Sequence, residues 1–245
     1  MLEVRGLTKQ FGALRASDGI DFDVAEGETH AVIGPNGAGK TTFISQLAGN
    51  LRPDSGRVRF AGADITALTA PRRARLGLAR SFQITSVYPD FSALHNVALA
   101  IQAHSGHSFR FWRDARSDPA LIEPARKVLN EVGLSARVNV LAANLAHGEQ
   151  RQLEMAMALA TRPRLLLLDE PMAGMGTDES LRMIALLASL KRKHTIILVE
   201  HDMDAVFRLA DRISVLVYGR VIATDTPEKI RRNEEVRQAY LGSEA

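Results

Sequence analysis

The chain has 245 residues, which is long enough for one large α/β domain, or one domain with a sizeable insert, and either would bury a substantial core. Hydrophobic residues make up 46% and charged residues 24%, and the net charge of +3 is not segregated into a tail, so charge does not favour nucleic-acid binding. Without cysteine the chain can form neither disulfides nor thiolate metal sites. No segment approaches the roughly 18 uncharged apolar residues that cross a bilayer, and residues 1–5 are not typical of a signal peptide, so we expect a cytosolic protein.

The first part of the chain is predicted to be rich in β-strands. Residues 4–7, 20–24, 29–33 and 58–60 have strand patterns, and turns that contain glycine separate them. We expect these strands to surround a phosphate-binding unit that lies within the same part of the chain.

The phosphate-binding pattern G-x-x-x-x-G-K-S/T is matched at every required position, between the predicted strand 29–33 and a predicted helix at 42–48. In such a loop the glycines let backbone amides point at phosphate oxygens, and the start of the helix favours an anion. Lys40 would reach the β- and γ-phosphates, and the Thr41 hydroxyl would ligate Mg²⁺. The nucleotide-binding candidates of this loop are Gly34, Pro35, Asn36, Gly37, Ala38, Gly39, Lys40, Thr41 and Thr42.

The hydrophobic pattern then changes along the chain. Residues 85–161 show helical periodicity, which predicts a helical insert. Apolar strand patterns return at 164–168, 195–199 and 213–217 with a helix between each pair, so we expect a buried parallel sheet with right-handed crossovers. Residues 227–241 are predicted to form one or two short helices.

Two acids and a histidine follow the predicted strands. Asp169 and Glu170 come directly after strand 164–168, at the sheet edge where α/β folds bind ligands. Asp169 would hold Mg²⁺, and Glu170 would be the general base that polarises the attacking water. His201 follows the next strand along the chain, where it is suited to contact the γ-phosphate.

Residues 145–154 read Leu-Ala-His-Gly-Glu-Gln-Arg-Gln-Leu-Glu and open a predicted helix at 150–160. Together with loop 34–42, Gln83, the acidic pair, segment 173–176 and His201, they resemble the ATP-binding subunit of ABC transporters, in the family's order and over the whole chain. The resemblance implies an α/β P-loop NTPase core with a mostly parallel sheet, an antiparallel β subdomain and a helical insert. Residues 1–245 would then be a single ABC ATPase domain, with a helical subdomain inserted at about 85–161.

The resemblance also implies roles for single residues. Phe11 matches the aromatic residue that stacks on adenine, and Gln83 matches the glutamine that senses Mg²⁺ and water at the hinge to the helical insert. The signature loop, which comprises Ala146, His147, Gly148 and Glu149, would close over the γ-phosphate of an ATP held by a partner subunit. The catalytic site would thus be shared by two chains, with ATP and Mg²⁺ as cofactors, and a monomer would hydrolyse ATP poorly.

Four positions depart from the family pattern. Ala146 replaces the serine that would contact the γ-phosphate, a loss on the order of 1 kcal/mol if nothing replaces the hydroxyl, and His147 stands at a glycine. Gly176 replaces an aspartate, which puts a contact between the two subunits in doubt. Ser17 stands where a valine usually supports the nucleotide, so looser packing of the adenosine is expected.

Within the family, the alanine variant of the signature loop followed by residues 150–154 is similar to the branched-chain amino acid importer branch, and particularly to its LivG-type subunit. Segments 171–175, 200–203 and 239–242 fit the same branch. The resemblance implies a second ATPase subunit, LivF-type or a second copy of this chain, two transmembrane permease subunits and, indirectly, a solute-binding protein. The chain would lie peripherally at the cytoplasmic face of the inner or plasma membrane and would bind no nucleic acid.

Other functions stay open at this stage. Importers of urea, amides or aromatic acids share these features. An ABC-type ATPase that works on DNA or ribosomes usually has a long coiled-coil insert or two fused cassettes, and this chain has neither. A nucleotide-sensing module with little turnover is a further alternative, because the signature loop and segment 173–176 are altered.

Two basic segments remain. Residues 105–118 interleave aromatic residues with arginines, which suits a solvated loop of the helical insert or a surface near the permease or lipid headgroups. Arg72, Arg73 and Arg75 are expected to lie on an exposed helix face.

Overall fold

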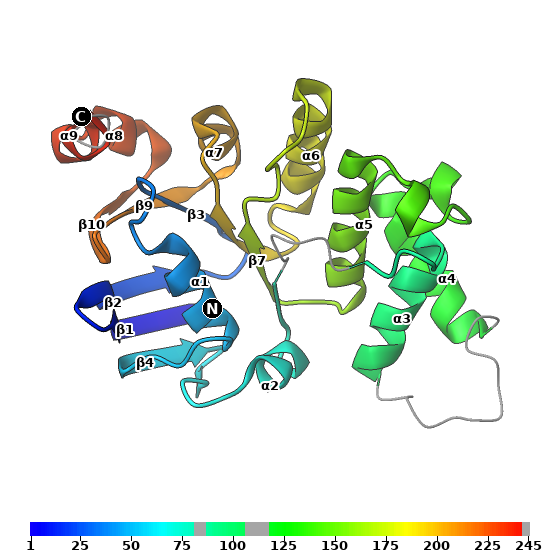
Figure 1. The fold of residues 1–245 in the computed structure, drawn as a ribbon, viewed down its shortest axis with the longest axis horizontal. Helices are drawn as coiled ribbons and strands as arrows, with labels where there is room; N and C mark the ends of the chain where they lie inside the picture. Colours follow the sequence, from blue (N-terminus) through cyan, green and yellow to red (C-terminus); the bar gives the residue numbers. More distant parts are fainter. Residues whose placement is uncertain (81–86, 106–117, 242–245) are drawn as a thin grey trace.

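The computed structural model describes residues 1–80, 87–105 and 118–241, except for the side chains of residues 105, 240 and 241. Two β-sheets lie side by side, and one group of helices lies at the opposite end of the molecule from the first sheet (Figure 1). Within the described ranges, no helix is long and apolar enough to cross a membrane.

The first sheet is antiparallel, with the strand order β2-β1-β4-β5. Its strands are β1 (Leu2–Phe11), β2 (Leu14–Val24), β4 (Ser55–Phe60) and β5 (Ala63–Asp64). Alternate residues such as Val4, Phe22 and Val58 point into a shared core with helix α1 (Lys40–Ala48), as the period of two along a strand requires. The predicted strands 4–7, 20–24 and 58–60 are confirmed.

The second sheet has the order β10-β9-β3-β8-β7-β6 and is parallel except for the edge strand β10. Its strands are β3 (Thr29–Ile33), β6 (Leu78–Arg80), β7 (Leu165–Asp169), β8 (Thr195–Val199), β9 (Arg212–Val217) and β10 (Arg220–Asp225). Every residue of β3, β7 and β8 is buried, because helices cover both faces of a parallel sheet. The predicted parallel strands are confirmed, whereas β6 and β10 were not predicted.

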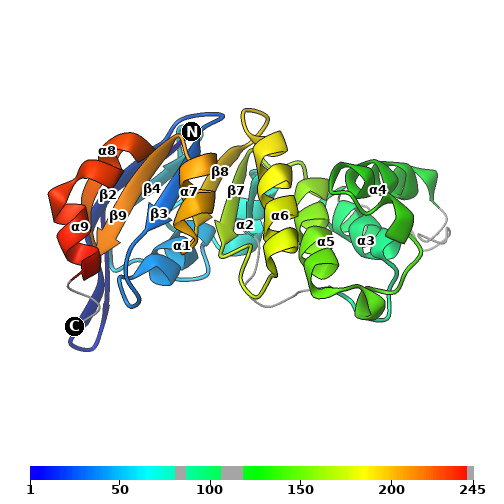
Figure 2. The same ribbon diagram turned by 90° about the horizontal axis from the view of Figure 1, so that it is seen from above.

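The helices α6 (Thr177–Leu190) and α7 (Met203–Leu209) connect the parallel strands. In Figure 2 they lie on the same face of the sheet, and α8 (Pro227–Arg232) and α9 (Glu234–Leu241) lie at the end of the molecule near β9 and β10. The two short helices expected near the end of the chain are confirmed.

A group of helices occupies the other end of the molecule (Figures 1 and 2). It consists of α3 (Ala93–Ser105), α4 (Pro119–Glu131), α5 (His147–Ala160) and two short 3-10 turns, η2 (Ser135–Arg137) and η3 (Ala142–Asn144). Buried side chains such as Val97, Leu129 and Leu153 join the three helices in one core that extends to α6. The helical character expected for residues 85–161 is confirmed in its described part, and α5 begins three residues before the predicted helix.

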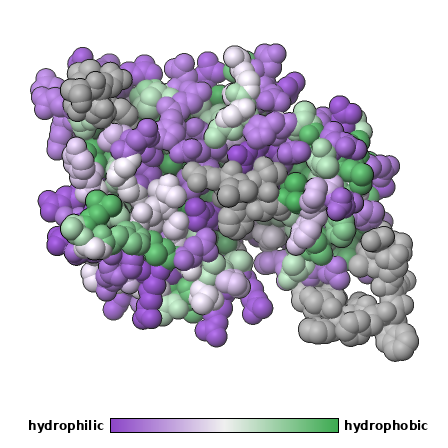
Figure 3. Space-filling model, in the orientation of Figure 1, coloured by the Kyte–Doolittle hydropathy of each residue, from purple (hydrophilic) through white to green (hydrophobic). Residues whose placement is uncertain are grey.

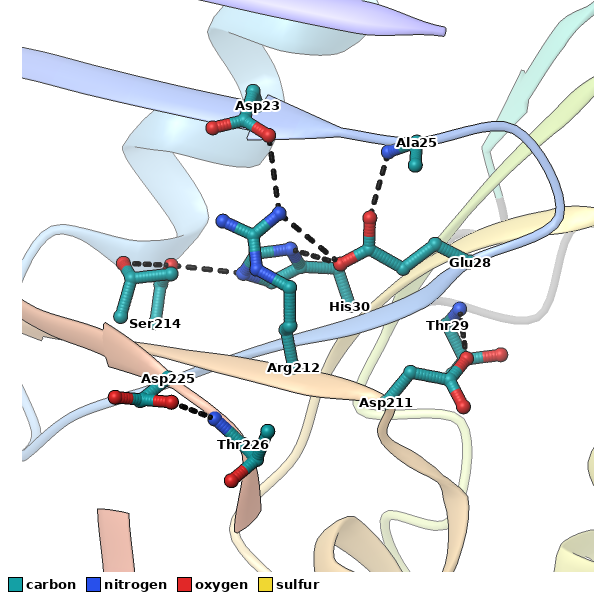
Figure 4. Close-up of polar contacts among 11 residues, drawn as sticks. Asp23, Ala25, Glu28, Thr29, His30, Asp211, Arg212, Ser214, Asp225 and Thr226 are labelled. Atoms are coloured by element: carbon teal, nitrogen blue, oxygen red, sulfur yellow. Dashed lines mark hydrogen bonds and ion pairs between the residues drawn. The ribbon is translucent and has the colours of Figure 1, made fainter. Parts of the chain in front are cut away.

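A polar cluster, buried at Glu28, His30 and Ser214 and partly exposed at Asp23 and Arg212, joins the two sheets (Figure 4). His30 is fully buried on β3, where its Nδ1 lies 3.0 Å from Glu28 Oε1 and its Nε2 lies 2.8 Å from Ser214 Oγ on β9. Arg212 of β9 donates a hydrogen bond to Asp23 of β2 at 3.0 Å and lies 3.5 Å from Glu28. The cluster therefore fixes the antiparallel sheet against the parallel one.

The expectation that the arginine cluster is an exposed helix face is wrong for Arg73. Helix α2 (Ala70–Arg75) leaves Arg72 and Arg75 exposed, but Arg73 is 1% exposed. Its guanidinium donates to four backbone carbonyls, two of which, those of Gln46 and Leu47, belong to the last turn of α1. Arg73 caps α1 because the last carbonyls of a helix have no partner within the helix.

Candidate nucleotide-binding site

The phosphate-binding loop lies between β3 and α1, as its sequence predicts. Gly39 has a φ of +102°, and a Cβ atom there would lie 2.2 Å from the backbone oxygen of Ala16. A Cβ atom on Gly34, whose φ is +156°, would lie 2.0 Å from the backbone oxygen of Leu216. Neighbouring backbone thus packs against the loop so closely that only glycine fits at both positions.

Lys40 directs its charge into this loop. Its side chain is buried, and Nζ donates to the carbonyl oxygens of Gly34 at 2.7 Å and Pro35 at 3.0 Å. Burial lowers the pKa of Lys40, while the nearby charges of Glu170 and Asp169 partly oppose this shift. A cation held by neutral carbonyls in the loop is placed to bind a phosphate anion.

Asp169 ends β7 and is 1% exposed. Its Oδ2 accepts a hydrogen bond from Arg80 at 2.9 Å, and the same guanidinium donates to Ser45 Oγ of α1 at 3.2 Å. Burial raises the pKa of Asp169, and the hydrogen bond and charge of Arg80 oppose that rise. Arg80 therefore compensates a carboxylate that would otherwise be costly to bury.

Glu170 and His201 face each other at the carboxyl edge of the parallel sheet. His201 Nε2 lies 2.6 Å from Glu170 Oε1, and both side chains are partly exposed. Glu170 has a φ of +52°, a conformation that is uncommon for residues other than glycine, and its backbone N–H donates to Val199 of β8 at 2.9 Å. The two predicted hydrolytic residues are thus brought together by the ends of adjacent strands.

Glu200 supports this pair from within the protein. It is 5% exposed and accepts hydrogen bonds from the backbone amides of Met172 and His201, each at 3.0 Å. Burial raises the pKa of its carboxyl group, and these amides oppose the rise. Glu200 thereby ties the segment after β7 to the segment after β8.

The oxygen atoms at this edge suit Mg²⁺. Thr41 provides a hydroxyl in the first turn of α1, and Asp169 provides a carboxylate at the end of β7, both of the hard oxygen type that Mg²⁺ prefers. No group of three or more histidine, cysteine or acidic side chains that could hold a metal occurs among the described residues. The one hydroxyl and one carboxylate of Thr41 and Asp169 fit Mg²⁺, because this ion takes one or two carboxylates and completes its shell with phosphate and water.

The signature loop lies at the start of α5, with Ala146 as the residue before the helix. The Ala146 backbone N–H donates to Glu149 Oε2 at 3.0 Å, while His147 Nε2 lies 3.5 Å from the carbonyl oxygen of Ala173. Gly148 is buried. The loop is separated from the phosphate-binding loop of the same chain by β7 and the segment that follows it (Figure 1).

The hairpin between β1 and β2 presents apolar side chains. Phe11 is 47% exposed and Leu14 66% exposed, and Figure 3 shows apolar residues gathered at the end of the molecule where this hairpin lies. An exposed aromatic ring of this kind can stack on a base. Ser17 is instead fully buried, where its hydroxyl donates to Gln46 Oε1 at 2.7 Å.

Two sequence-based expectations fall outside the described residues. Gln83 lies in the segment 81–86, and nearly all of the aromatic and basic segment 105–118 lies in 106–117.

Two residues that shape the site, Arg80 and Glu200, were not assigned a role from sequence. Arg80 carries no motif of its own, and its pairing with Asp169 depends on β6 lying beside β7.

These features define a class of protein. The site has three parts: a glycine-rich loop at the start of a helix, an apolar strand followed by two acids, and a histidine after the next strand along the chain. Together they form the site of a P-loop ATPase. The additional antiparallel sheet and the group of helices around α5 make it an ATP-binding cassette.

Comparison with known proteins agrees with this class. Residues 17–173 match the ABC transporter family, and residues 220–245 match the family described as branched-chain amino acid ATP-binding cassette transporter. The chain therefore belongs to the ABC transporter family, as an ATP-binding subunit of its branched-chain amino acid branch.

Two curated relatives match the chain over almost its whole length. It is 41% identical to the high-affinity branched-chain amino acid transport ATP-binding protein BraF of Pseudomonas aeruginosa, over 99% of this chain and 98% of that protein. It is 36% identical to LivG of Escherichia coli with the same coverage. Among solved structures, it resembles an ATP-binding cassette of an ABC transporter in its ADP conformation, with a TM-score of 0.87, 28% identity and coverage of 99% and 98%. A nucleotide-free cassette gives a TM-score of 0.85 at 27% identity, with 98% of each chain covered.

Proposed function

We propose that this ATPase energises the import of branched-chain amino acids as one of the two nucleotide-binding subunits of a membrane transporter. The relatives that match it over their full length are ATP-binding proteins of high-affinity branched-chain amino acid transport. The observation that carries hydrolysis is the pair of Glu170 and His201, whose side chains meet at 2.6 Å beside the phosphate-binding loop.

The residues divide the work as follows. Lys40 and the amides of the loop hold the phosphates of ATP, Phe11 stacks on adenine, and Thr41, Asp169 and Gln83 hold Mg²⁺. Bound Mg²⁺ neutralises charge on the phosphates. Glu170 accepts a proton from the attacking water, and His201 orients Glu170 and the γ-phosphate oxygens.

The site is completed by a second ATPase subunit, either a LivF-type protein or another copy of this chain. Residues 146–149 supply the amide groups at the start of α5 to the γ-phosphate of the ATP that the partner holds. ATP binding then closes the two subunits, and hydrolysis with phosphate release reopens them.

The permease docks in an apolar hollow between the cassette core and the helical group. The hollow has a volume of about 420 Å³. Its lining includes Pro71 and Ala74 of α2, Leu78 and Arg80 of β6, and Met157 and Ala158 of α5. Both the cassette core and the helical group line the hollow. A permease helix bound there would therefore be displaced when these two parts move relative to each other. A chain docked in this way lies peripherally at the cytoplasmic face of the membrane, and a solute-binding protein delivers the amino acid from the other side.

The test of hydrolysis is the variant Glu170→Gln in the assembled transporter. Loss of the general base slows phosphate release by about 10²- to 10⁴-fold while ATP binding stays intact. Asp178→Asn, which removes an exposed carboxylate from the first turn of α6, serves as the control and keeps the wild-type rate. Near-normal turnover by Glu170→Gln would contradict the assignment.

The solute is tested separately in vesicles that contain this ATPase with candidate permease subunits and a candidate solute-binding protein. ATP-driven uptake of leucine, isoleucine or valine is expected. Uptake of urea, an amide or an aromatic acid in place of these would assign the chain to an importer of another solute, and phosphate release that does not respond to any permease would favour a nucleotide-sensing module.

A further inference from the structure

The carboxylate of Glu179 lies between two loops of the candidate site. Its Oε2 accepts a hydrogen bond from the backbone N–H of Gly176, at the start of its own helix α6. Its Oε1 accepts one from the backbone N–H of Gly148, in the first turn of α5. Both distances are 3.3 Å, so one carboxylate connects the start of the signature helix to the end of segment 173–176.

The Glu179 carboxylate packs closely against Gly148, so a larger residue at that position would displace the end of the Glu179 side chain. A Cβ atom at Gly148 would lie 2.6 Å from Glu179 Oε1 and 2.7 Å from its carboxyl carbon. A second contact joins the same two loops, because His147 Nε2 lies 3.5 Å from the Ala173 carbonyl oxygen. The signature loop thus contacts segment 173–179 at two residues, His147 and Gly148.

Capping of α6 accounts for only half of this arrangement. A glutamate at the third position of a helix commonly accepts the N–H of the residue before the helix, as Glu179 does with Gly176. The same role would be satisfied if Oε1 faced solvent. Instead Oε1 binds the amide of another helix, which a cap does not require.

The Gly148 amide belongs to the group that the proposed function assigns to the γ-phosphate of the partner's ATP. A phosphate oxygen and the Glu179 carboxylate are both anions, and both seek the N–H groups at the start of α5. Two anions at hydrogen-bond distance from one donor repel each other strongly. Phosphate can therefore take the Gly148 amide only if Glu179 gives it up.

We propose that Glu179 is a positioning residue of the signature loop: it holds the Gly148 amide before the subunits close and is displaced from it by the γ-phosphate. The proposal rests on the proposed function. In this arrangement Glu179 fixes the loop in shape and opposes closure until ATP is present in the facing site. Loss of the bond to Gly148 also removes one of the contacts between the signature loop and segment 173–179, so binding of phosphate at the loop alters the packing of the segment that follows Glu170.

The test uses Glu179→Gln in the full-length chain, with Asp178→Asn as its matched control. Glutamine serves the capping role of the third helical position as well as glutamate does, so the fold of α6 is preserved. Its neutral oxygen binds an amide roughly half as strongly as a carboxylate does, and it does not repel phosphate. Asp178 lies beside Glu179 in the same turn and is exposed, so its substitution removes the same charge without touching the Gly148 amide.

Two measurements are made on the three proteins. The Gly148 amide resonance of the isotope-labelled isolated chain reports on the hydrogen bond, and we expect Glu179→Gln to shift it while Asp178→Asn does not. The ATP concentration that gives half-maximal closure with the partner ATPase, followed by energy transfer between labels, is expected to fall about fivefold in Glu179→Gln only. ATP affinity of the isolated chain is expected to be equal in all three, since its phosphate-binding loop is unchanged.

The outcomes are separable. An unshifted Gly148 resonance in Glu179→Gln would overturn the contact, and a shifted resonance with unchanged closure would reduce Glu179 to a helix cap and overturn the competition. If the wild-type chain showed no ATP-dependent closure with any ATPase partner, the proposed function would fail, and the competition with it. The Gly148 resonance would still decide the contact independently.

Discussion

Replacement of Arg73 by methionine tests a buried arginine that donates four hydrogen bonds to backbone carbonyls. Arg73 donates to the carbonyl oxygens of Gln46 and Leu47 at 2.7 Å each, of Leu68 at 3.0 Å and of Thr66 at 3.1 Å. Four hydrogen bonds at about 1 kcal/mol each amount to about 4 kcal/mol. Methionine fills a similar volume but leaves these carbonyls without their donor.

Burial of the charge offsets part of this contribution. Desolvation lowers the pKa of Arg73 to about 10, which shows that the protein interior disfavours the guanidinium cation. A buried charge can even be replaced by an apolar side chain with a gain in stability. Because four carbonyls surround Arg73, we expect the hydrogen bonds to prevail and the variant to lose about 2–4 kcal/mol.

The assay is urea unfolding followed by circular dichroism, with thermal unfolding in parallel. For a chain of this size a loss of 2–4 kcal/mol corresponds to a fall in Tm of roughly 5–15 °C. Arg72→Met, on the exposed side of the same helix, is the control and is expected to stay within about 0.5 kcal/mol of the wild type. A variant Arg73→Met that is as stable as Arg72→Met would refute the capping role, because desolvation would then have cancelled all four hydrogen bonds.

Two further predictions concern buried polar groups. Ser17→Val is expected to lose about 1–3 kcal/mol because it leaves Gln46 Oε1 buried without a donor, and the double variant with Gln46→Leu is expected to recover most of that loss in the same urea titration. Burial raises the pKa of Glu28, but its hydrogen bonds from His30 and Ala25 and the charge of Arg212 outweigh this and leave the pKa lowered. A lowered carboxyl pKa gives stability that is present above the unfolded pKa of about 4.3 and is lost as the pH falls towards the folded value. Arg212→Gln is therefore expected to move the midpoint of acid unfolding to higher pH. The control Arg208→Gln, which replaces an exposed arginine of α7, is expected to leave the midpoint in place. An unchanged midpoint in both variants would show that Arg212 does not lower the pKa of Glu28.

The sequence predicted the elements of the fold whose patterns are local. The apolar runs at 29–33 and 195–199 coincide with β3 and β8, because strands buried on both faces are recognisable by composition alone. Strand β6 has only three residues, and half of β10 is polar, so neither forms a pattern that stands out. Their places are fixed by pairing with β7 and β9, which is a property of the assembled sheet.

The candidate site was predictable where one short segment carries the whole chemistry, as in loop 34–42. It was less predictable where residues distant in sequence meet. Arg73 shows this directly. Its place in a cluster of arginines predicted an exposed helix face, but its side chain turns inward to donate to carbonyls in the last turn of α1, which lies beside α2. The roles of Arg80 and Glu179 likewise depend on partners that only the fold brings close to them, Asp169 for Arg80 and Gly148 for Glu179.

Arg80 contacts the carboxyl end of β7, and Glu179 contacts the residue that precedes α6 in the segment after that strand. Arg80 lines the apolar hollow and holds Asp169, the last residue of the strand. Glu179 holds the signature loop and the residues that follow Glu170. A displacement of α5 relative to the sheet alters the hollow and the signature loop together, since α5 contributes to both. Movement of the helical group is thus coupled through Glu179 to the residue that precedes α6, and it alters the hollow that Arg80 lines beside Asp169.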